Sequence, residues 1–298
     1  MGPMKRGSFI AVLALALLAP AQASASMLLT RNASGVSLEV NRRGVAMVSY
    51  RQGGRTWHVL LWGAVNTRGL RFQYDRSGGW ASHRADWRTF RNACGPYTGP
   101  RLGYLTAACT APDGSHWAVQ QWQRHKGNYG GTHGPRELRV SHWRGPLARL
   151  EIHTGWAWYG RYHHMFGRYT YRGKGVYGFR YGPHGEPLDL LGRNIYVDSL
   201  DPDYGPGWHR VNGFLSGRFR GQFCFNFGPK GSTGNLRLTG RSSVNRYRAS
   251  TTGPGVTPDI FVSFEGPGPR YDADLDHRMD VLERRLAGRG TACYRTVN

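Results

Sequence analysis

Acidic residues and lysine are both scarce in this chain. Its 298 residues include 18 Asp and Glu against 40 Lys and Arg, and Lys occurs at only four positions, so arginine carries nearly all of a formal net charge of +22. GC-rich codon usage explains the choice of Arg over Lys, but it does not explain the excess of cations over anions. The charge is larger than solubility requires and predicts an anionic partner.

Features that would mark several other classes of protein are missing. Outside the N-terminus no apolar run reaches the roughly 18 residues of a membrane span, which excludes a multi-pass membrane protein. No H-E-x-x-H, G-x-S-x-G or P-loop motif occurs, which argues against a zinc protease, an α/β-hydrolase and a nucleotide enzyme. With 10 Trp, 16 Tyr and 12 Phe the chain can build a packed core, and we expect it to fold.

The N-terminus has the pattern of a secretory signal peptide. Lys5 and Arg6 precede an apolar stretch from Phe9 to Leu18, and small residues follow. The pattern predicts a signal peptide over residues 1–25 and a secreted, extracellular mature chain of residues 26–298. An anchor helix is the less favoured alternative, because the apolar stretch is too short to span a membrane.

Export makes the four cysteines, Cys94, Cys109, Cys224 and Cys293, candidates for disulfide bonds, and none has the C-x-x-C spacing of a zinc site. Three pairings are possible. We favour Cys94–Cys109, because the Gly-Pro pairs between them form a compact turn, and with it Cys224–Cys293. A nucleophilic cysteine would leave an odd partner.

Turn residues recur every 8–12 positions, and the residues between them alternate between apolar and polar, as in half-buried strands. We expect strands at residues 36–40, 45–50, 56–62, 70–74, 116–123, 137–143, 149–153, 167–171, 176–181, 194–197, 222–227, 236–238 and 260–264. One helix is expected, with Asp274 as N-cap, an apolar stripe of Leu275, Met279, Leu282 and Leu286 that packs on the sheet, and an end at Gly288. The predicted fold is a single, mainly β domain: an antiparallel β-sandwich or jelly-roll-like domain with one C-terminal helix.

Five segments carry a resemblance to a known family. They are R-T-W-H-V-L-L-W-G-A-V-N at 55–66, F-G-R-Y-T-Y-R-G at 166–173, G-R-N-I-Y-V-D at 192–198, Y-G-P-G-W at 204–208 and P-G-V-T-P-D at 254–259. Together they are similar to segments of an uncharacterised secreted family of actinobacteria. The resemblance implies secretion and a single domain, and it transfers no catalytic residue.

The segment from Arg168 to Tyr181 reads as a hairpin, joined at residues 173–175, that sorts aromatic and cationic side chains onto opposite faces. Either the aromatic face is core and the arginines are solvated, or the aromatic rings stack on sugars and the arginines bind carboxylates or phosphates. Aromatic residues immediately before the hairpin, with glycine neighbours, enlarge this supply. The candidate polymer-binding residues are Arg168, Arg172, Arg180, Trp156, Trp158 and Tyr162.

Asp198, Asp201 and Asp203 form a rare acidic group in this basic chain. Oxygen ligands at short spacing suit Ca²⁺, so the three are candidate metal ligands. The alternative, which we favour, is that they form a turn or pair with arginines. No other cofactor is predicted.

Three short segments look similar to the signature strands of jelly-roll alginate lyases: E-L-R at 137–139, E-I-H at 151–153 and Y-R-G-K-G-V-Y at 171–177. The resemblance implies that Arg139 neutralises a uronate carboxylate, His153 is the base and Tyr177 supplies the proton for β-elimination. The chain departs from that family: Glu151 stands where the family has Gln, Pro135 stands where it has Arg, and the motifs lie much closer together.

Two functions follow from these patterns. The first is a secreted binding protein for an anionic extracellular or cell-envelope polymer, such as an anionic polysaccharide or a cell-wall polymer. The alternative is a polysaccharide lyase that acts on a uronate polymer by β-elimination. Arginines interleaved with Trp and Tyr could also bind nucleic acid, but export makes this a side capability.

Overall fold

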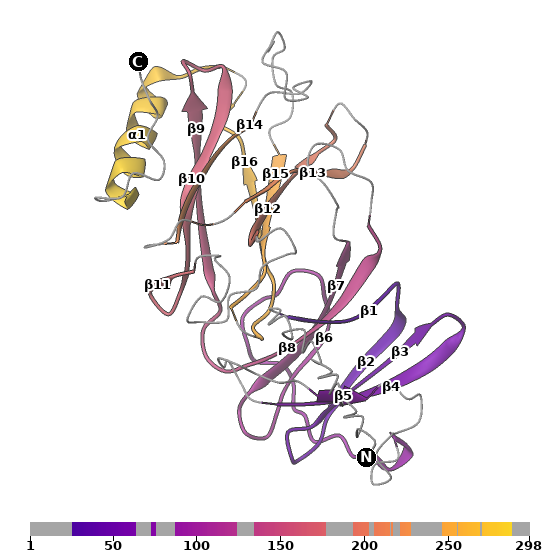
Figure 1. The fold of residues 1–298 in the computed structure, drawn as a ribbon. Coiled ribbons are helices and arrows are strands. Elements are labelled where there is room, and N and C mark those ends of the chain that lie inside the picture. The colour runs from indigo at the N-terminus through magenta and orange to yellow at the C-terminus, as the bar shows by residue number, and fades with distance from the viewer. Residues whose placement is uncertain are drawn as a thin grey trace, which may run out of the picture.

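The computed structural model describes residues 26–63, 73–75, 87–123, 134–176, 193–202, 206–214, 216, 221–227, 246–254, 256–268 and 270–287. Within these residues it contains four antiparallel sheets and a single α-helix, which lies near the C-terminus (Figure 1). The predicted mainly β fold with one C-terminal helix is confirmed.

Two of the sheets form the N-terminal half of the molecule. The first has the order β1 (Met27–Arg31), β8 (Arg136–Trp143), β7 (His116–Gln123) and β6 (Leu105–Thr110). The second has the order β2 (Ser34–Val40), β3 (Ala46–Gln52), β4 (Arg55–Trp62) and β5 (Gln73–Asp75). A short 3₁₀ turn, η1, covers Trp87–Thr89. One buried core, with Val48 and Tyr50 from the second sheet against Trp117 and Val140 from the first, joins the two sheets.

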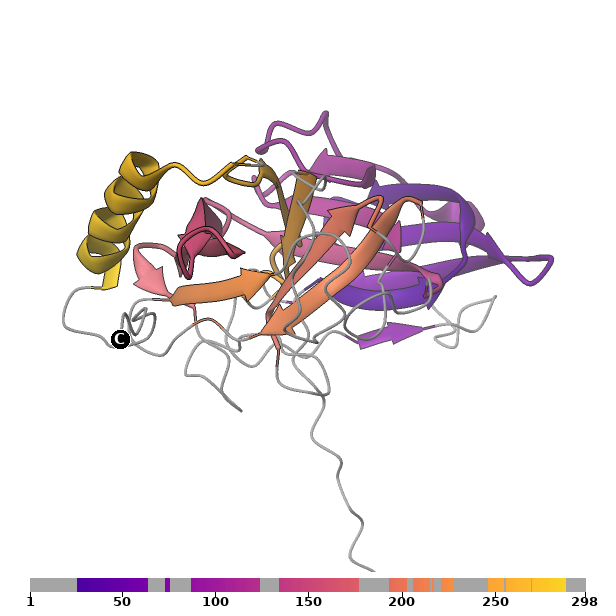
Figure 2. The same ribbon diagram turned by 90° about the horizontal axis from the view of Figure 1, so that it is seen from above.

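The C-terminal half has its own pair of sheets and its own core. One sheet has β11 (Lys174–Gly175), β10 (Tyr162–Tyr171) and β14 (Gln222–Phe227) in order, with β9 (Arg149–Ala157) also paired to β10. The other has the order β13 (Trp208–Phe214), β12 (Ile195–Leu200), β15 (Arg246–Thr251) and β16 (Ile260–Glu265). Side chains such as Met165, Tyr169, Val197 and Ala249 form this second core. The helix α1 (Ala273–Ala287) lies beside β9 and β10 (Figures 1 and 2).

The two halves meet around the buried side chain of Asp259, in the segment that connects β15 to β16. Ser26 Oγ donates a hydrogen bond of 2.6 Å to Oδ1, and Trp122 Nε1 donates one of 3.0 Å to Oδ2. The side-chain amide of Gln120 bonds both the backbone N–H and the carbonyl of Asp259. Arg139 lies 3.9 Å from Oδ2. A residue of the C-terminal half is therefore held on all of its polar atoms by the N-terminal half.

Helix α1 docks through polar side chains rather than through the predicted apolar stripe alone. Its most buried residues are Asp276, Glu283 and Leu286. Glu283 Oε2 lies 3.0 Å from Nε2 of His164 on β10, and both side chains are buried. Asp272, not the predicted Asp274, caps the helix, because its carboxylate accepts the backbone N–H of Leu275 at 2.9 Å.

Most of the predicted strands are present, and two, β7 and β14, match the expected bounds. Strands β9 and β10 are longer than predicted, because they form one long hairpin in which Tyr162 still pairs with Ala157. The strands β1, β6, β11, β13 and β15 were not predicted. The expected strand at 236–238, the end of the helix at Gly288 and residues 177–181 of the second hairpin arm lie outside the described residues.

The disulfide Cys94–Cys109 is confirmed. It connects β6 to the segment before it, where Gly95 forms an isolated bridge with Thr110. Cys224, on β14, is also disulfide-bonded. Its predicted partner, Cys293, lies outside the described residues.

Two buried histidines give the fold a defined pH dependence. Burial lowers the pKa of His142 to about 4, where its ring stacks on Trp117 with 3.9 Å between centroids. Burial likewise lowers the pKa of His163 to about 4, beside Tyr247. Because both rings are neutral in the fold and take up a proton when the chain unfolds, protonation at mildly acidic pH favours the unfolded state.

We therefore expect the free energy of unfolding to fall as pH drops from about 6.5 towards 4, by up to about 1.4 kcal/mol per pH unit for each histidine. Above pH ~7 these two histidines are neutral in both the folded and the unfolded state, so they do not make the free energy of unfolding depend on pH. Urea unfolding at a series of pH values measures this, and the variant His163→Gln should reduce the slope between pH ~6.5 and ~5 by up to about 1.4 kcal/mol per pH unit. An unchanged slope in that variant contradicts the assignment.

Candidate functional site

The long β9–β10 hairpin carries most of the residues that the sequence singled out. The pairing register sets Tyr169 opposite Leu150 and Arg168 opposite Glu151. Because side chains alternate along a strand, the first pair faces the buried core and the second pair faces outward, beside α1. Arg168 and Tyr169 therefore lie on opposite faces of β10, as the hairpin pattern predicts, whereas Phe166, which precedes the predicted hairpin segment, shares the face of Arg168.

The turn of this hairpin displays two large aromatic side chains to solvent. Trp158 and Tyr159 are 59% and 78% exposed, the highest values among the exposed large hydrophobic residues in the described part of the chain. Both have positive φ, at 55° and 54°, and Gly160 follows at 82°. A side chain with a Cβ in this left-handed region costs roughly 1 kcal/mol per residue relative to the common conformations. The backbone conformation that exposes the two rings therefore lowers the stability of the fold.

A second layer fixes the position of this turn. The side chain of Tyr271, in the segment before α1, packs so closely on Gly160 that a Cβ there would lie 2.6 Å from the Tyr271 Cβ. Tyr271 also contacts Trp156 edge to face and donates a hydrogen bond of 3.2 Å to Asp276. The turn that carries the exposed rings is therefore held in place by the packed side chains of Tyr271 and Trp156, which we call the packed support.

A group of three polar side chains lies on the outer face of the same hairpin. Glu151 accepts a hydrogen bond of 2.9 Å from His153 Nε2 and one of 3.3 Å from Arg168 Nη2, and all three are partly exposed. The hydrogen bond from His153, and then Arg168, hold the pKa of Glu151 below its usual value despite partial burial. The carboxylate is thus ionised at neutral pH and engaged by two neighbours.

Cations gather at the opposite end of β10. Arg149 pairs with Thr170, and Lys174 pairs with Tyr171 across the β10–β11 turn. Arg172 occupies this turn at φ 49° and lies over the Tyr171 ring at 5.3 Å. The two arms of the predicted hairpin therefore join at residues 172–173, rather than at 173–175. Arg149, Arg172 and Lys174 are all exposed.

The structure separates the predicted polymer-binding residues into two groups. Trp158 lies at one end of β10 and Arg172 at the other, a distance of roughly 30 Å for ten strand residues. Tyr162, at the aromatic end, is half-buried. The prediction was wrong for Trp156, which is 2% exposed and belongs to the packed support. Arg180 lies outside the described residues.

Of the residues that the lyase resemblance implies, Arg139 and His153 do not share a surface. Arg139 is buried in β8 of the N-terminal half, and its guanidinium donates to Glu137 at 2.9 and 2.8 Å and to the Ser26 carbonyl at 2.8 Å. His153 lies on β9 of the C-terminal half. A guanidinium that already neutralises Glu137 has no exposed face for a uronate, so the role implied for Arg139 was wrong. Tyr177 lies outside the described residues.

Asp198 is likewise not placed to bind calcium. It is buried on β12, between two directly paired arginines: Arg210 Nε donates to Oδ1 at 2.5 Å and Arg248 Nη2 donates to Oδ2 at 2.6 Å. Burial alone would raise the pKa of Asp198, but the two guanidinium groups outweigh it and hold the pKa below its usual value. Both carboxylate oxygens of Asp198 accept hydrogen bonds from arginines, so the arginine-pairing alternative is confirmed.

The other two candidate calcium ligands do not complete a site either. Asp201 accepts the backbone N–H of Gly207 at 2.6 Å, which confirms its role in a turn. Asp203 lies outside the described residues. Within the described ranges no group of three His, Cys, Asp or Glu side chains is arranged to hold a metal ion.

Sequence reasoning did not include three exposed residues in the candidate set. Tyr159 and Tyr271 belong to the aromatic end of the hairpin, and Arg149 to its cationic end. The W-Y-G run at 158–160 carried a usable signal, because a glycine after two aromatic residues favours a tight turn that exposes them. For Tyr271 no local signal existed, since its position depends on the docking of α1.

Comparison with protein-family models, with curated proteins and with solved structures found no match for this chain. No helix in the described part of the chain is long and apolar enough to cross a membrane. The site is therefore judged on its own geometry.

The ion pairs of buried Asp198 with Arg210 and Arg248 can be tested by removing the charge of Asp198. In Asp198→Asn two buried guanidinium groups lose their shared carboxylate, and we expect a loss of about 3–5 kcal/mol in the free energy of unfolding. Urea denaturation measures the loss. The control is Asp201→Asn, which removes an exposed carboxylate of the same turn region and should change stability by less than about 1 kcal/mol. Equal effects of the two substitutions contradict the assignment.

Proposed function

We propose that this protein is a secreted binding protein for an anionic extracellular or cell-envelope polymer, and that it holds the polymer on the β9–β10 hairpin. The observation that carries the proposal is the pair Trp158 and Tyr159, held exposed in strained backbone on a packed support. Strain of this kind persists where the surrounding structure enforces it, and it gathers at functional sites. Flat exposed rings suit stacking on sugars.

The cationic end of the hairpin supplies the second part of the proposal. Arg149, Arg172 and Lys174 are exposed there, and Glu151 is engaged by His153 and Arg168. Guanidinium groups bind carboxylates and phosphates through paired hydrogen bonds. A polymer that lies along the hairpin would meet stacking rings at one end and cations at the other, roughly 30 Å apart.

The test is affinity for polygalacturonate, with a neutral polysaccharide of similar length as the reference. The variant Trp158→Gly/Tyr159→Gly should bind about tenfold or more weakly, because it removes both rings. Its stability should stay within about 1 kcal/mol of the wild type, because glycine adopts positive φ without strain. This separates loss of binding from loss of fold.

Two controls complete this experiment. Trp62→Ala removes an exposed aromatic side chain, 40% accessible, from the N-terminal half and should leave binding unchanged. Raising the salt to about 1 M should weaken the wild-type binding, because salt screens exposed charges. Equal affinity for the neutral and acidic polymers, or full binding by the glycine variant, contradicts the proposal. Release of unsaturated uronate products would favour the lyase alternative.

A further inference from the structure

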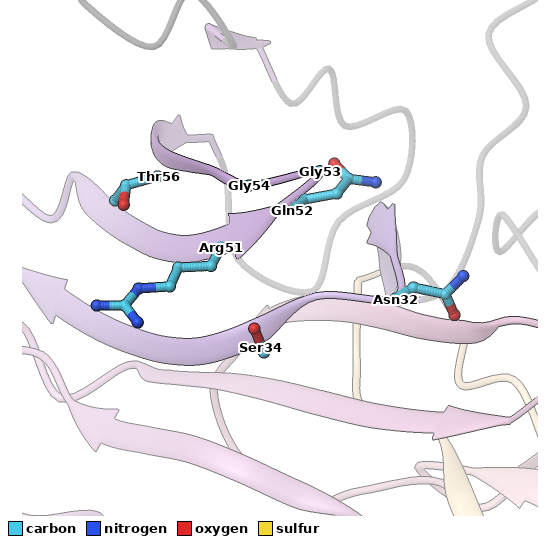
Figure 3. A pocket seen from close by; sticks show the side chains of 7 residues that line it. All are labelled: Asn32, Ser34, Arg51, Gln52, Gly53, Gly54 and Thr56. Carbon is cyan, nitrogen blue, oxygen red and sulfur yellow. The ribbon is translucent and has the colours of Figure 1, made fainter.

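A hollow of about 550 Å³ lies in the N-terminal half, next to the β3–β4 turn. It is lined by Asn32, Ser34, Arg51, Gln52, Gly53, Gly54 and Thr56 (Figure 3). The β3–β4 turn beside it lies far from the turn between β9 and β10 (Figure 1). None of its residues belongs to the surface described above.

Strand register sets a guanidinium between two hydroxyl groups in this hollow. Arg51 on β3 pairs with Ser34 on β2 and with Thr56 on β4, so the three side chains form a row across the sheet. The preceding residue, Tyr50, is in the core, so this row faces outward. A bulge in β2 between Ser34 and Ser37 widens the strand pair at this point.

The walls of the hollow are held by contacts within the protein. Gln52 Oε1 accepts a hydrogen bond of 2.7 Å from Thr30, and its Nε2 donates one of 2.9 Å to the carbonyl of Arg31. Asn32 Oδ1 accepts the backbone N–H of Arg136 at 3.0 Å. The side-chain amides of Gln52 and Asn32 are therefore hydrogen-bonded within the protein. The side chains of Ser34, Arg51 and Thr56 are available to a ligand.

The charge around the hollow favours an anion. Within the described residues the guanidinium of Arg51 has neither an ion pair nor a hydrogen bond, and its side chain is exposed. The nearby carboxylate of Glu137 is buried and already bound by Arg139, with Arg31 at 3.6 Å. The hollow therefore presents a guanidinium that the protein does not neutralise.

An aromatic ring lies one row further along the same face. Ser49 and His58 pair directly across β3 and β4, two positions from Arg51 and Thr56, which is roughly 6.6 Å along the strands. Their side chains are joined by a hydrogen bond of 2.8 Å, and the His58 ring stacks on Trp87 with 4.2 Å between centroids. Trp87 is 37% exposed. Burial lowers the pKa of His58 and outweighs the opposing effect of the Glu39 carboxylate, which also acts on this ring, so the ring is neutral at neutral pH.

We infer that this hollow is a second binding site, for a carboxylate-bearing sugar unit of an acidic polysaccharide. Arg51 binds the carboxylate with its paired N–H groups, Ser34 and Thr56 bond sugar hydroxyls, and Trp87 faces the neighbouring sugar ring. The inference rests on the proposed function and deepens it, because it names a uronate as the class of unit recognised.

The experiment is an NMR titration of the isotope-labelled protein with a galacturonate trisaccharide. The amide signals of Gly53 and Gly54 should shift, and in Arg51→Gln these shifts should disappear. Arg51→Lys, which keeps the charge but not the planar pair of donors, should bind about tenfold more weakly. Arg43→Gln is the matched control, because Arg43 is an exposed arginine in the neighbouring β2–β3 turn, and it should titrate like the wild type.

Two further probes decide the class of ligand. A neutral galactose trisaccharide should leave the Gly53 and Gly54 signals in place, and glycerol phosphate should shift them less than the uronate. Equal shifts with either probe, or unchanged shifts in Arg51→Gln, overturn the inference.

The same titration separates this site from the hairpin. If Trp158→Gly/Tyr159→Gly binds polygalacturonate fully but the shifts occur and depend on Arg51, the proposed hairpin site is wrong and this inference stands. If polymer binding depends on the hairpin while the Gly53 and Gly54 signals do not move, the inference is wrong and the proposed function stands.

Discussion

The buried carboxylate of Asp259 is the interaction on which the arrangement of the two halves depends. It lies between β15 and β16 of the C-terminal half, yet its two oxygens accept hydrogen bonds from Ser26 and Trp122 of the N-terminal half, and Gln120 of the same half bonds the Asp259 backbone. A buried carboxylate without partners is strongly unfavourable, so neither half can move away from the other without exposing it or leaving it unsatisfied. The two sandwiches have separate cores, and the bonds to Asp259 fix them relative to each other.

Other buried charges are also satisfied within the protein. Arg139, which resembles a catalytic arginine in sequence, bonds Glu137 and the carbonyl of Ser26, and Asp198 is bound by two arginines of neighbouring strands. The two candidate surfaces lie far apart within the described residues: one is at the aromatic turn between β9 and β10, and the other is next to the turn between β3 and β4 (Figure 1). One body with two distant surfaces suits the binding of a long polymer.

The sequence allowed the fold class, most strands, the C-terminal helix and the Cys94–Cys109 disulfide to be predicted, because alternation, turn residues and cysteine spacing are local signals. It did not allow β1 to be predicted, whose pairing partner β8 lies more than 100 positions along the chain. For the candidate site, Trp158 and Arg168 were predicted to be available and are partly exposed, whereas the burial of Trp156 depends on Tyr271 and α1, which approach from more than 100 positions away. The hollow at Arg51 arises from pairing across three strands, which no local pattern reveals.

The cooperativity of unfolding tests the role of Asp259 most directly. Scanning calorimetry of the wild-type protein should show a single transition for both halves, because neither core can open without disrupting the shared network. In Asp259→Asn the carboxylate that accepts bonds from both Ser26 and Trp122 is replaced by a group with one donor end, so the halves should unfold in two separate transitions, the first at a lower temperature. Two resolved transitions in the wild type, or a single transition at an unchanged temperature in the variant, would contradict this account.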